Sequence, residues 1–206
     1  KTVYQPFRLP QLLLTSYIIP SKIVYVAHKG MQLHEELGYQ NKNSLVISNG
    51  YAINKYQVDA ESRLLTRHSL GIKDNEDIIG FIGRFHPTKG VENFIKSAKI
   101  LIKHKLDIKF LMVGKGMDLR NKKLISLIEK EGILNKFILV GESKNIITEL
   151  LAMDIFVLSS KTEGFPNVLA EAMLMRLPCV STDVGDASMI LDNLGIIVPP
   201  ENNMEL

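Results

Sequence analysis

The sequence predicts a doubly wound α/β domain built on a parallel sheet, and three observations lead to this prediction. Short apolar runs, which are typical of buried strands, alternate with helical segments from residue 78 to residue 198. The connections between them are short, as in consecutive βαβ units. The composition is that of a globular protein, with 46% hydrophobic and 23% charged residues in a chain of 206.

The elements of this domain are expected in regular alternation. Expected strands cover residues 78–82, 108–113, 137–140, 155–158, 179–181 and 196–198. Expected helices cover residues 91–103, 119–130, 146–152, 167–176 and 187–191. The helix 91–103 is clearly marked, because its apolar residues recur at helical spacing. We therefore expect a Rossmann-like sheet with helices on both faces.

Residues 1–48 precede this regular pattern, and we place a domain boundary after them. They hold candidate elements that are listed here: strands at 22–26 and 45–47, and a short helix at 32–37 closed by Gly38. The apolar residues at 12–14 and 17–20 fit no complete element. Ser48-Asn49-Gly50 is a strong turn signal, and a helix candidate at 61–70, ended by Gly71, follows it. Residues 49–206 are then a second domain, which we expect to lack its closing helix.

Charge and cysteine content exclude several classes of function. The net charge of +3, from 25 basic and 22 acidic residues, is too small to indicate a nucleic-acid partner. The single cysteine, Cys179, permits no disulfide within the chain, which suits a reducing cytosolic compartment. It lies in an apolar run, so we interpret it as a core residue. No apolar window is long enough to cross a membrane.

The stretch from Glu163 to Glu171 is the strongest candidate for chemistry. It joins the expected strand 155–158 to the expected helix 167–176. Glu163 would follow the carboxyl end of the strand, and Glu171 would lie in the second turn of the helix. Free N–H groups at a helix start bind anions, and open α/β sheets bind ligands at this edge. The alternative is a pair of surface acids, with Glu171 placed favourably in the helix dipole.

A second candidate site consists of Arg84 and Lys89, which flank a turn between the strand 78–82 and the helix 91–103. A guanidinium fork, an ammonium group and a helix start together suit a phosphate group. Taken alone, an exposed basic loop explains the segment equally well.

Two glycines, Gly114 and Gly141, each follow an expected strand. Gly114 begins a GxGxxG pattern, but Leu119 stands where the third glycine belongs, which weakens the interpretation as a dinucleotide-dependent dehydrogenase. These glycines would let the backbone approach a ligand, such as a nucleobase edge, or would simply form ordinary turns.

Together these four stretches resemble a known family. Gly83-Arg84 with Lys89-Gly90, followed by Glu163-Gly-Phe165 and Glu171 as a Glu-x7-Glu motif, resembles the C-terminal, donor-binding half of the retaining GT-B glycosyltransferases of family 4 (group 1) type. The motifs occur in the expected order over roughly residues 20–200. The stretches 178–186 and 198–200 are similar to a bacterial subgroup linked to surface-polysaccharide assembly.

The resemblance implies a role for each candidate residue. A nucleotide-sugar donor would lie in residues 49–206, with Arg84 and Lys89 on its diphosphate, Glu171 on the ribose hydroxyls and Glu163 beside the sugar and its phosphate. Glu163, Arg84 and Lys89 are thus the implied catalytic residues. Further implied donor contacts are listed here: Gly164, Phe165, Asn167, Val168, Leu169, Gly114 and Gly141. The resemblance also implies no cofactor and no metal; fixed cations would stabilise the charge on the leaving diphosphate.

The whole enzyme implied by the resemblance would transfer a sugar, with retention, to a glycan or lipid-linked acceptor in the cytoplasm. Residues 1–48 would be a remnant of its acceptor-side N-terminal domain, through which any contact with the inner face of a membrane would be made. The chain alone is expected to bind the donor weakly and to be inactive. Arg176 stands at a helix end where many family members have glycine, so that cap is expected to differ.

Two alternative functions stay open. One is a catalytically idle subunit that binds a sugar nucleotide, although intact Arg84, Lys89 and Glu171 argue against it. The other is a sugar-nucleotide epimerase of the GT-B type, which lacks the combination of the basic pair with the Glu-x7-Glu motif.

Overall fold

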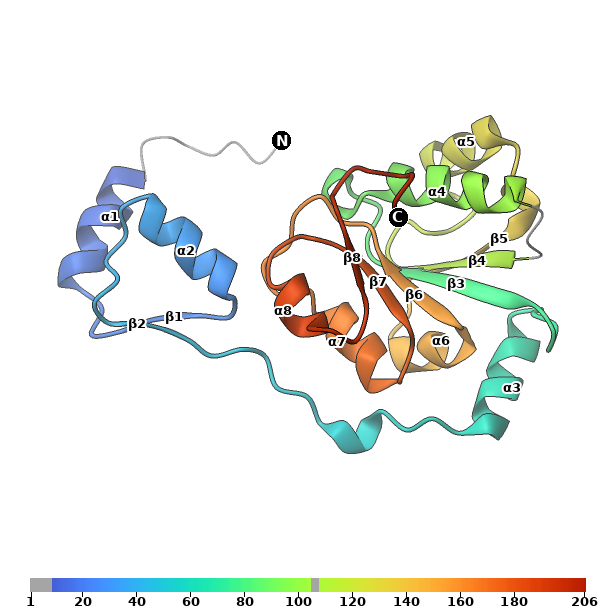
Figure 1. The fold of residues 1–206 in the computed structure, drawn as a ribbon, viewed down its shortest axis with the longest axis horizontal. Coiled ribbons are helices and arrows are strands. Elements are labelled where there is room, and N and C mark those ends of the chain that lie inside the picture. Colours follow the sequence, from blue (N-terminus) through green and yellow to red (C-terminus); the bar gives the residue numbers. More distant parts are fainter. Residues whose placement is uncertain (1–8, 105–107) are drawn as a thin grey trace. The chain divides into compact units, whose positions relative to one another are not determined.

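The computed structural model describes residues 9–104 and 108–206, and the chain divides into two compact units, Lys1–Gly50 and Tyr51–Leu206 (Figure 1). The boundary that we expect after residue 48 lies after Gly50 in the structure.

Within residues 9–50, the part of the first unit that the structure describes, there are two helices and two short strands. In chain order these are α1 (Leu9–Ile18), β1 (Ile23–Tyr25), α2 (His28–Glu36) and β2 (Ser44–Val46). The strands are parallel, with Ile23 opposite Ser44. Helix α1 shows that the expectation was wrong for residues 12–14 and 17–18, which lie in this helix, whereas residues 19–20 follow its end. Apolar residues occupy several sides of this helix, and Leu14 and Ile18 are both exposed, so the sequence shows no amphipathic period there.

The second unit contains a six-stranded parallel sheet and its covering helices. Its strands are β3 (Asp77–Ile82), β4 (Ile108–Val113), β5 (Phe137–Gly141), β6 (Ile155–Leu158), β7 (Cys179–Thr182) and β8 (Ile196–Val198). Its α-helices are α3 (Ala60–Ser69), α4 (Val91–Lys103), α5 (Lys122–Glu131), α6 (Ile146–Ala152), α7 (Asn167–Leu174) and α8 (Ala187–Leu191). The described residues of this unit also contain three short 3₁₀ turns: η1 (Ile53–Lys55), η2 (Pro87–Lys89) and η3 (Leu134–Lys136).

Two hydrophobic cores, one on each face of the sheet, hold this unit together. Helices α4 and α5 cover one face, where Phe94, Ile95, Leu124 and Ile128 pack on the strands (Figure 1). Helices α6, α7 and α8 cover the other face through apolar residues such as Leu150, Leu169 and Leu191. The doubly wound α/β prediction is therefore confirmed, and burial of these two apolar layers is the main force that stabilises the sheet.

The order of strands in the sheet is β5-β4-β3-β6-β7-β8. The strands β3, β4 and β5 are added toward one edge and β6, β7 and β8 toward the other, so the topological switch point lies between β3 and β6. The two halves meet along one short ladder, in which Ile79 lies opposite Ile155 and Gly80 opposite Phe156. A side chain at Gly80 would clash with Met153, since a Cβ there would lie 1.9 Å from the Met153 sulfur. In open parallel sheets the crevice at such a switch point, outside the carboxyl ends of the strands, is where ligands bind.

Three helices have ends that differ by two or more residues from those expected. Helix α2 begins at His28, four residues before the expected start at residue 32. Helix α5 begins at Lys122 rather than at residue 119, because the Asn121 side chain caps it by accepting hydrogen bonds from the N–H groups of Lys123 and Leu124. Helix α7 ends at Leu174 rather than at residue 176. Arg176 has a φ of 59°, and its N–H donates to the Met173 carbonyl at 2.8 Å. Arg176 therefore adopts the left-handed conformation that glycine usually supplies at a helix end.

A cluster of charges closes the amino-terminal end of the β3–β6 seam. Arg67, whose side chain is only 3% exposed, and Arg63 both bind Asp154, which immediately precedes β6. The Arg67 guanidinium also donates to the carbonyls of Ala152, Lys73 and Glu76. Asp154 in turn accepts the N–H of Ile78 at 2.8 Å. The cluster ties α3 to the sheet.

Candidate functional site

The loops that follow the carboxyl ends of the strands are joined to one another by backbone hydrogen bonds. The N–H of Phe85, after β3, donates to the Lys115 carbonyl, after β4, at 2.8 Å. The N–H of Gly114 donates to the Gly141 carbonyl at 2.7 Å, and the N–H of Lys161 donates to the Thr88 carbonyl at 2.8 Å. These bonds fix the loops that carry the predicted site residues, including both glycines, to one edge of the sheet.

Lys89 and Glu163, which are separated by more than seventy residues in sequence, are in direct contact at this edge. The Lys89 Nζ lies 2.5 Å from the Glu163 Oε1, and the two side chains are 22% and 13% exposed. The Ser160 hydroxyl donates to the same Oε1 at 2.7 Å. Within the described part of the chain, the other carboxylate oxygen of Glu163 accepts no hydrogen bond. The pair is fixed on one side and still has hydrogen-bonding capacity on the other.

Gly90 allows the Lys89 segment to reach β6 so closely. It has a φ of 62°, and a Cβ there would lie 1.8 Å from the Ser159 carbonyl oxygen. The Ser159 hydroxyl donates to the carbonyls of Lys89 and Gly90, both at 3.1 Å. A larger residue at position 90 would therefore separate the two segments that carry the ion pair.

A second close approach supports the loop that begins at Glu163. Gly185, after β7, has a φ of 54°, and a Cβ there would lie 2.1 Å from the Gly164 carbonyl oxygen. The N–H of Asp186 donates to that same carbonyl at 3.0 Å. The loop after β7 thus holds the backbone of Glu163 and Gly164 in place.

Glu171 lies on α7 and is held by tyrosines that sequence reasoning did not identify. The Tyr56 hydroxyl donates to the Glu171 Oε1 at 3.2 Å, and the Tyr51 hydroxyl donates to the Asn167 side-chain oxygen at 2.9 Å. Burial raises the pKa of Glu171, and the hydrogen bond from Tyr56 partly opposes that rise. Burial and the nearby Glu171 raise the pKa of Tyr51 to about 12. At neutral pH both phenols are therefore protonated donors.

The remaining predicted residues lie in the loop after β3, in the loop after β6 and in α7. Arg84 is exposed at the start of the loop after β3, and its guanidinium forms no ion pair with the described residues. Gly164, Phe165 and Val168 lie in the loop and helix start after β6. Leu169 is fully buried, and its N–H already donates to the Pro166 carbonyl at 3.0 Å. The structure thus brings Lys89 and Glu163 into contact, whereas it shows no hydrogen bond of Arg84 or Glu171 to either of them.

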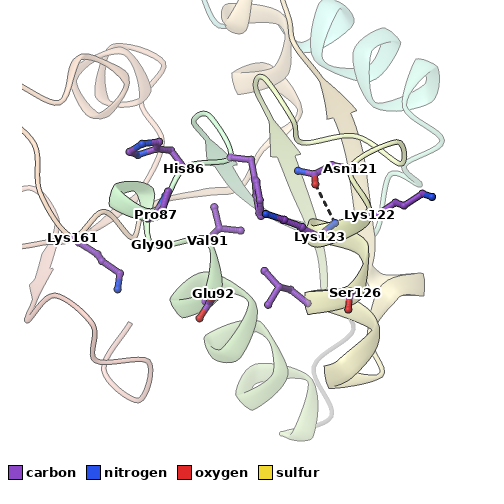
Figure 2. Close-up of a pocket in the computed structure, with 12 residues that line it drawn as sticks. His86, Pro87, Gly90, Val91, Glu92, Asn121, Lys122, Lys123, Ser126 and Lys161 are labelled. Carbon is purple, nitrogen blue, oxygen red and sulfur yellow. Dashed lines mark hydrogen bonds between the residues drawn. The ribbon is translucent and has the colours of Figure 1, made fainter. Parts of the chain in front are cut away.

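A cavity of 810 Å³ lies next to this edge, between the starts of α4 and α5 (Figure 2). Its lining comes from the loop after β3, the start of α4, the start of α5 and the loop after β6: Phe85, His86, Pro87, Gly90, Val91, Glu92, Asn121, Lys122, Lys123, Ser126, Leu127 and Lys161. None of Arg84, Lys89, Glu163 and Glu171 lines it. The cavity is therefore a feature separate from the predicted donor site, although Gly90 contributes to both.

Three contacting residues that the sequence did not indicate differ in how far they lie from their partners along the chain. Ser160 stands three residues before Glu163 and two residues after the expected strand 155–158, so a hydroxyl beside the carboxylate could have been anticipated. Tyr51 and Tyr56 are more than a hundred residues away from Asn167 and Glu171. No local pattern in the sequence indicates those contacts.

The described residues offer neither a cluster of metal ligands nor a helix that could cross a membrane. Among residues 9–104 and 108–206, no three histidine, cysteine, aspartate or glutamate side chains are grouped as ligands for a metal ion. In the same residues, no helix has both the length and the apolar character that a membrane crossing requires.

Comparison with solved structures supports this fold. An Anabaena protein, Alr3699/HepE, in complex with UDP superposes with a TM-score of 0.87 at 23% identity, over 98% of this chain and 56% of that one. The C-terminal domain of a glycosyl transferase group 1 family protein (LpcC) from Francisella tularensis superposes with a TM-score of 0.63 at 27% identity, over 75% of this chain and 83% of that one.

Comparison with known sequences gives the family. The Escherichia coli UDP-Gal:alpha-D-GlcNAc-diphosphoundecaprenol alpha-1,3-galactosyltransferase is 30% identical over 150 residues, which are 72% of this chain and 38% of that enzyme. The chain thus spans less than half the length of this relative. The family model described as glycosyl transferases group 1 matches residues 62–206, which include every predicted site residue. This chain therefore belongs to the group 1 glycosyltransferase family.

Proposed function

We propose that residues 51–206 bind the nucleoside-diphosphate sugar of a retaining glycosyltransferase, which transfers the sugar to a glycan or lipid-linked acceptor. The contact between Lys89 and Glu163 carries the proposal, because it places a cation and a carboxylate together at the switch point of the sheet. The UDP bound to the Anabaena neighbour, and the UDP-sugar donor in the name of the Escherichia coli relative, support a nucleotide sugar as the ligand.

The chemistry we propose follows from the charges of these groups. The bond between the sugar C1 and the diphosphate oxygen breaks, and its electron pair stays on that oxygen. The Lys89 ammonium and the Arg84 guanidinium stabilise this negative charge more strongly than they stabilise the intact donor. The acceptor hydroxyl attacks C1 from the side of the leaving group and gives its proton to the departing phosphate, which retains the configuration at C1.

Glu163 has a positioning role in this proposal rather than that of a covalent nucleophile. Its Oε1 is occupied by Lys89 and Ser160, so it orients the ammonium group toward the phosphate. Its other oxygen is available to accept a hydroxyl of the donor sugar. Glu171, on the next helix, is placed to accept the vicinal hydroxyls of the ribose.

We place the enzyme in the cytoplasm, in polysaccharide biosynthesis, with no nucleic-acid partner and no metal or cofactor. Relatives named for capsular and lipopolysaccharide core biosynthesis support the placement in polysaccharide biosynthesis. Contact with the acceptor and with a membrane face would then be made outside residues 51–206.

Isothermal titration calorimetry of the 206-residue chain with UDP-, GDP- and ADP-glucose tests donor binding. We expect saturable binding of at least one of them, and a loss of at least tenfold in affinity in Lys89→Met and in Glu171→Gln, because each removes a charge-assisted contact worth about 1.5–3 kcal/mol. Lys96→Met, the same change at an exposed position on α4, is the matched control and should bind like the wild type. Absence of binding for every sugar nucleotide at millimolar concentration would contradict the proposal.

Retention is tested separately in an active protein that contains this chain. The anomeric carbon of the product glycoside, whose configuration NMR reads from its proton, should have the same configuration as that of the donor sugar. An inverted product would refute retention and leave donor binding untouched.

A further inference from the structure

Two tyrosines of the segment 51–56 form hydrogen bonds with side chains in the first two turns of α7. Tyr51 donates to the side chain of Asn167, the first residue of the helix, and Tyr56 donates to Glu171, one turn further on. The two rings also contact each other edge to face, with centroids 6.3 Å apart. The Tyr56 ring packs against the core on this face of the sheet, so its hydroxyl is delivered from a fixed base.

We propose that Tyr56 is a positioning residue for the donor site, which holds the Glu171 carboxylate in the orientation that a ribose diol requires. The inference rests on the proposed function, in which Glu171 accepts the ribose hydroxyls. A carboxylate can rotate about its last side-chain bond, and a hydrogen bond to one oxygen removes that freedom before the ligand arrives.

The charge state of Glu171 supports the same role. A donated hydrogen bond stabilises the ionised carboxylate, and ionised oxygens accept the hydroxyl protons of a diol more strongly than a protonated carboxyl does. In the described part of the chain, Tyr51 and Tyr56 are the titratable groups that interact with Glu171, and no lysine or arginine shares this work. The loss of the Tyr56 hydroxyl is therefore not compensated by a neighbouring cation.

The test uses Tyr56→Phe, which keeps the ring and removes only the hydroxyl. The ligands are UDP, GDP and ADP, each with its 2′,3′-dideoxy analogue, and calorimetry measures their affinities for the 206-residue chain. We expect the nucleoside diphosphate that binds to lose about three- to tenfold in affinity in Tyr56→Phe, the range that one hydrogen bond supplies. The dideoxy analogue, which has no diol, should bind wild type and variant equally. Tyr17→Phe removes a phenol hydroxyl in the first unit, bonded to the Gly38 carbonyl, and is the matched control.

A second measurement needs no ligand. The pKa of the Glu171 carboxyl, followed by carbon-13 NMR, should be higher in Tyr56→Phe than in the wild type, because the ionised form has lost a donor. On acidification, the affinity for the nucleoside diphosphate should therefore begin to fall at a higher pH in Tyr56→Phe than in the wild type. A role of Tyr56 in folding alone would move neither the pKa nor the difference between diol and dideoxy ligands.

The outcomes separate the two proposals. If the wild type binds a nucleoside diphosphate and Glu171→Gln weakens it, but Tyr56→Phe matches the wild type in affinity and in the Glu171 pKa, the positioning role is wrong and the proposed function stands. If the wild type binds no nucleoside diphosphate, the proposed function fails and takes this inference with it.

Discussion

The two ends of the β3–β6 seam both carry charged residues, and they use them differently. At the amino-terminal end, the Arg67 guanidinium binds three carbonyls and Asp154, and Asp154 also accepts from Arg63 and from a backbone N–H. At the carboxyl-terminal end, Glu163 accepts two hydrogen bonds on one oxygen, and the exposed Arg84 has no charged partner among the described residues.

This difference separates a structural cluster from a binding site. Charged groups whose hydrogen bonds are all made within the protein have no capacity left for a ligand. Removing one of them leaves its buried partners without hydrogen bonds, which lowers the free energy of unfolding. Charges with open capacity contribute less to folding and can stabilise a phosphate or a sugar. The same pair of strands thus supports stability at one end and, in our proposal, chemistry at the other.

The largest effect is expected at the amino-terminal end. Arg67→Met should lower the free energy of unfolding by about 3 kcal/mol, because it leaves Asp154 and three carbonyls with fewer donors in a largely buried site. Urea denaturation followed by circular dichroism measures this. A loss below 1 kcal/mol would show that the cluster is not structural and would remove the contrast between the two ends.

The next effect should leave stability largely unchanged. Lys89→Met is expected to reduce donor affinity at least tenfold while it changes the free energy of unfolding by less than about 1 kcal/mol, because a partly exposed ion pair contributes little to folding. Calorimetry and urea denaturation on the same sample give the two numbers. A variant that unfolds like Arg67→Met but binds the donor normally would reverse the assignment of the two ends.

A smaller effect is expected at the turn that leads into β7. Arg176→Gly should raise the free energy of unfolding by about 0.5–1 kcal/mol, since the left-handed conformation that Arg176 adopts is unfavourable for a residue with a side chain. Thermal denaturation should show a correspondingly higher melting temperature. A lower melting temperature would mean that the Arg176 side chain contributes more than its backbone costs.

The smallest effect concerns pH. The pKa of Glu171 is raised in the folded state, so over the window above its usual value of 4.5 the folded chain holds a proton that the unfolded chain has released. The free energy of unfolding therefore falls as the pH rises through that window. Glu171→Gln should remove this dependence. The free energy of unfolding of the wild type minus that of the variant should therefore decrease from pH 4.5 to pH 6.5. A constant difference would show that Glu171 has an ordinary pKa.

The sequence predicted the second unit well because its signals are local. Each strand from β3 to β8 is a short apolar run, and helix α4 shows its buried face as a period in the sequence. Asn121 shifted the start of α5 by three residues, since a cap depends on the geometry of one side chain. Helix α1 was missed because its apolar residues show no period that separates an inner face from an outer one.

The site was predictable only in part, for the same reason. The positions of Lys89 and Glu163 follow from the rule that carboxyl ends of parallel strands share one edge, and the contact between them agrees with it. The contacts of the tyrosines with α7 and of the arginines with Asp154 depend on how the helices pack in three dimensions. No local sequence pattern near these residues indicates that packing.

The order of the strands also bears on how the chain folds. Residues 77–141 and residues 155–198 each supply three neighbouring strands through local pairings, whereas the ladder between Ile79 and Ile155 must close a loop of about seventy-five residues. We expect each trio of strands to assemble early and their docking to come late. Lys89 stands on one side of that junction and Glu163 on the other, so a donor molecule that bridges them would act as a clamp on the finished sheet and slow its opening.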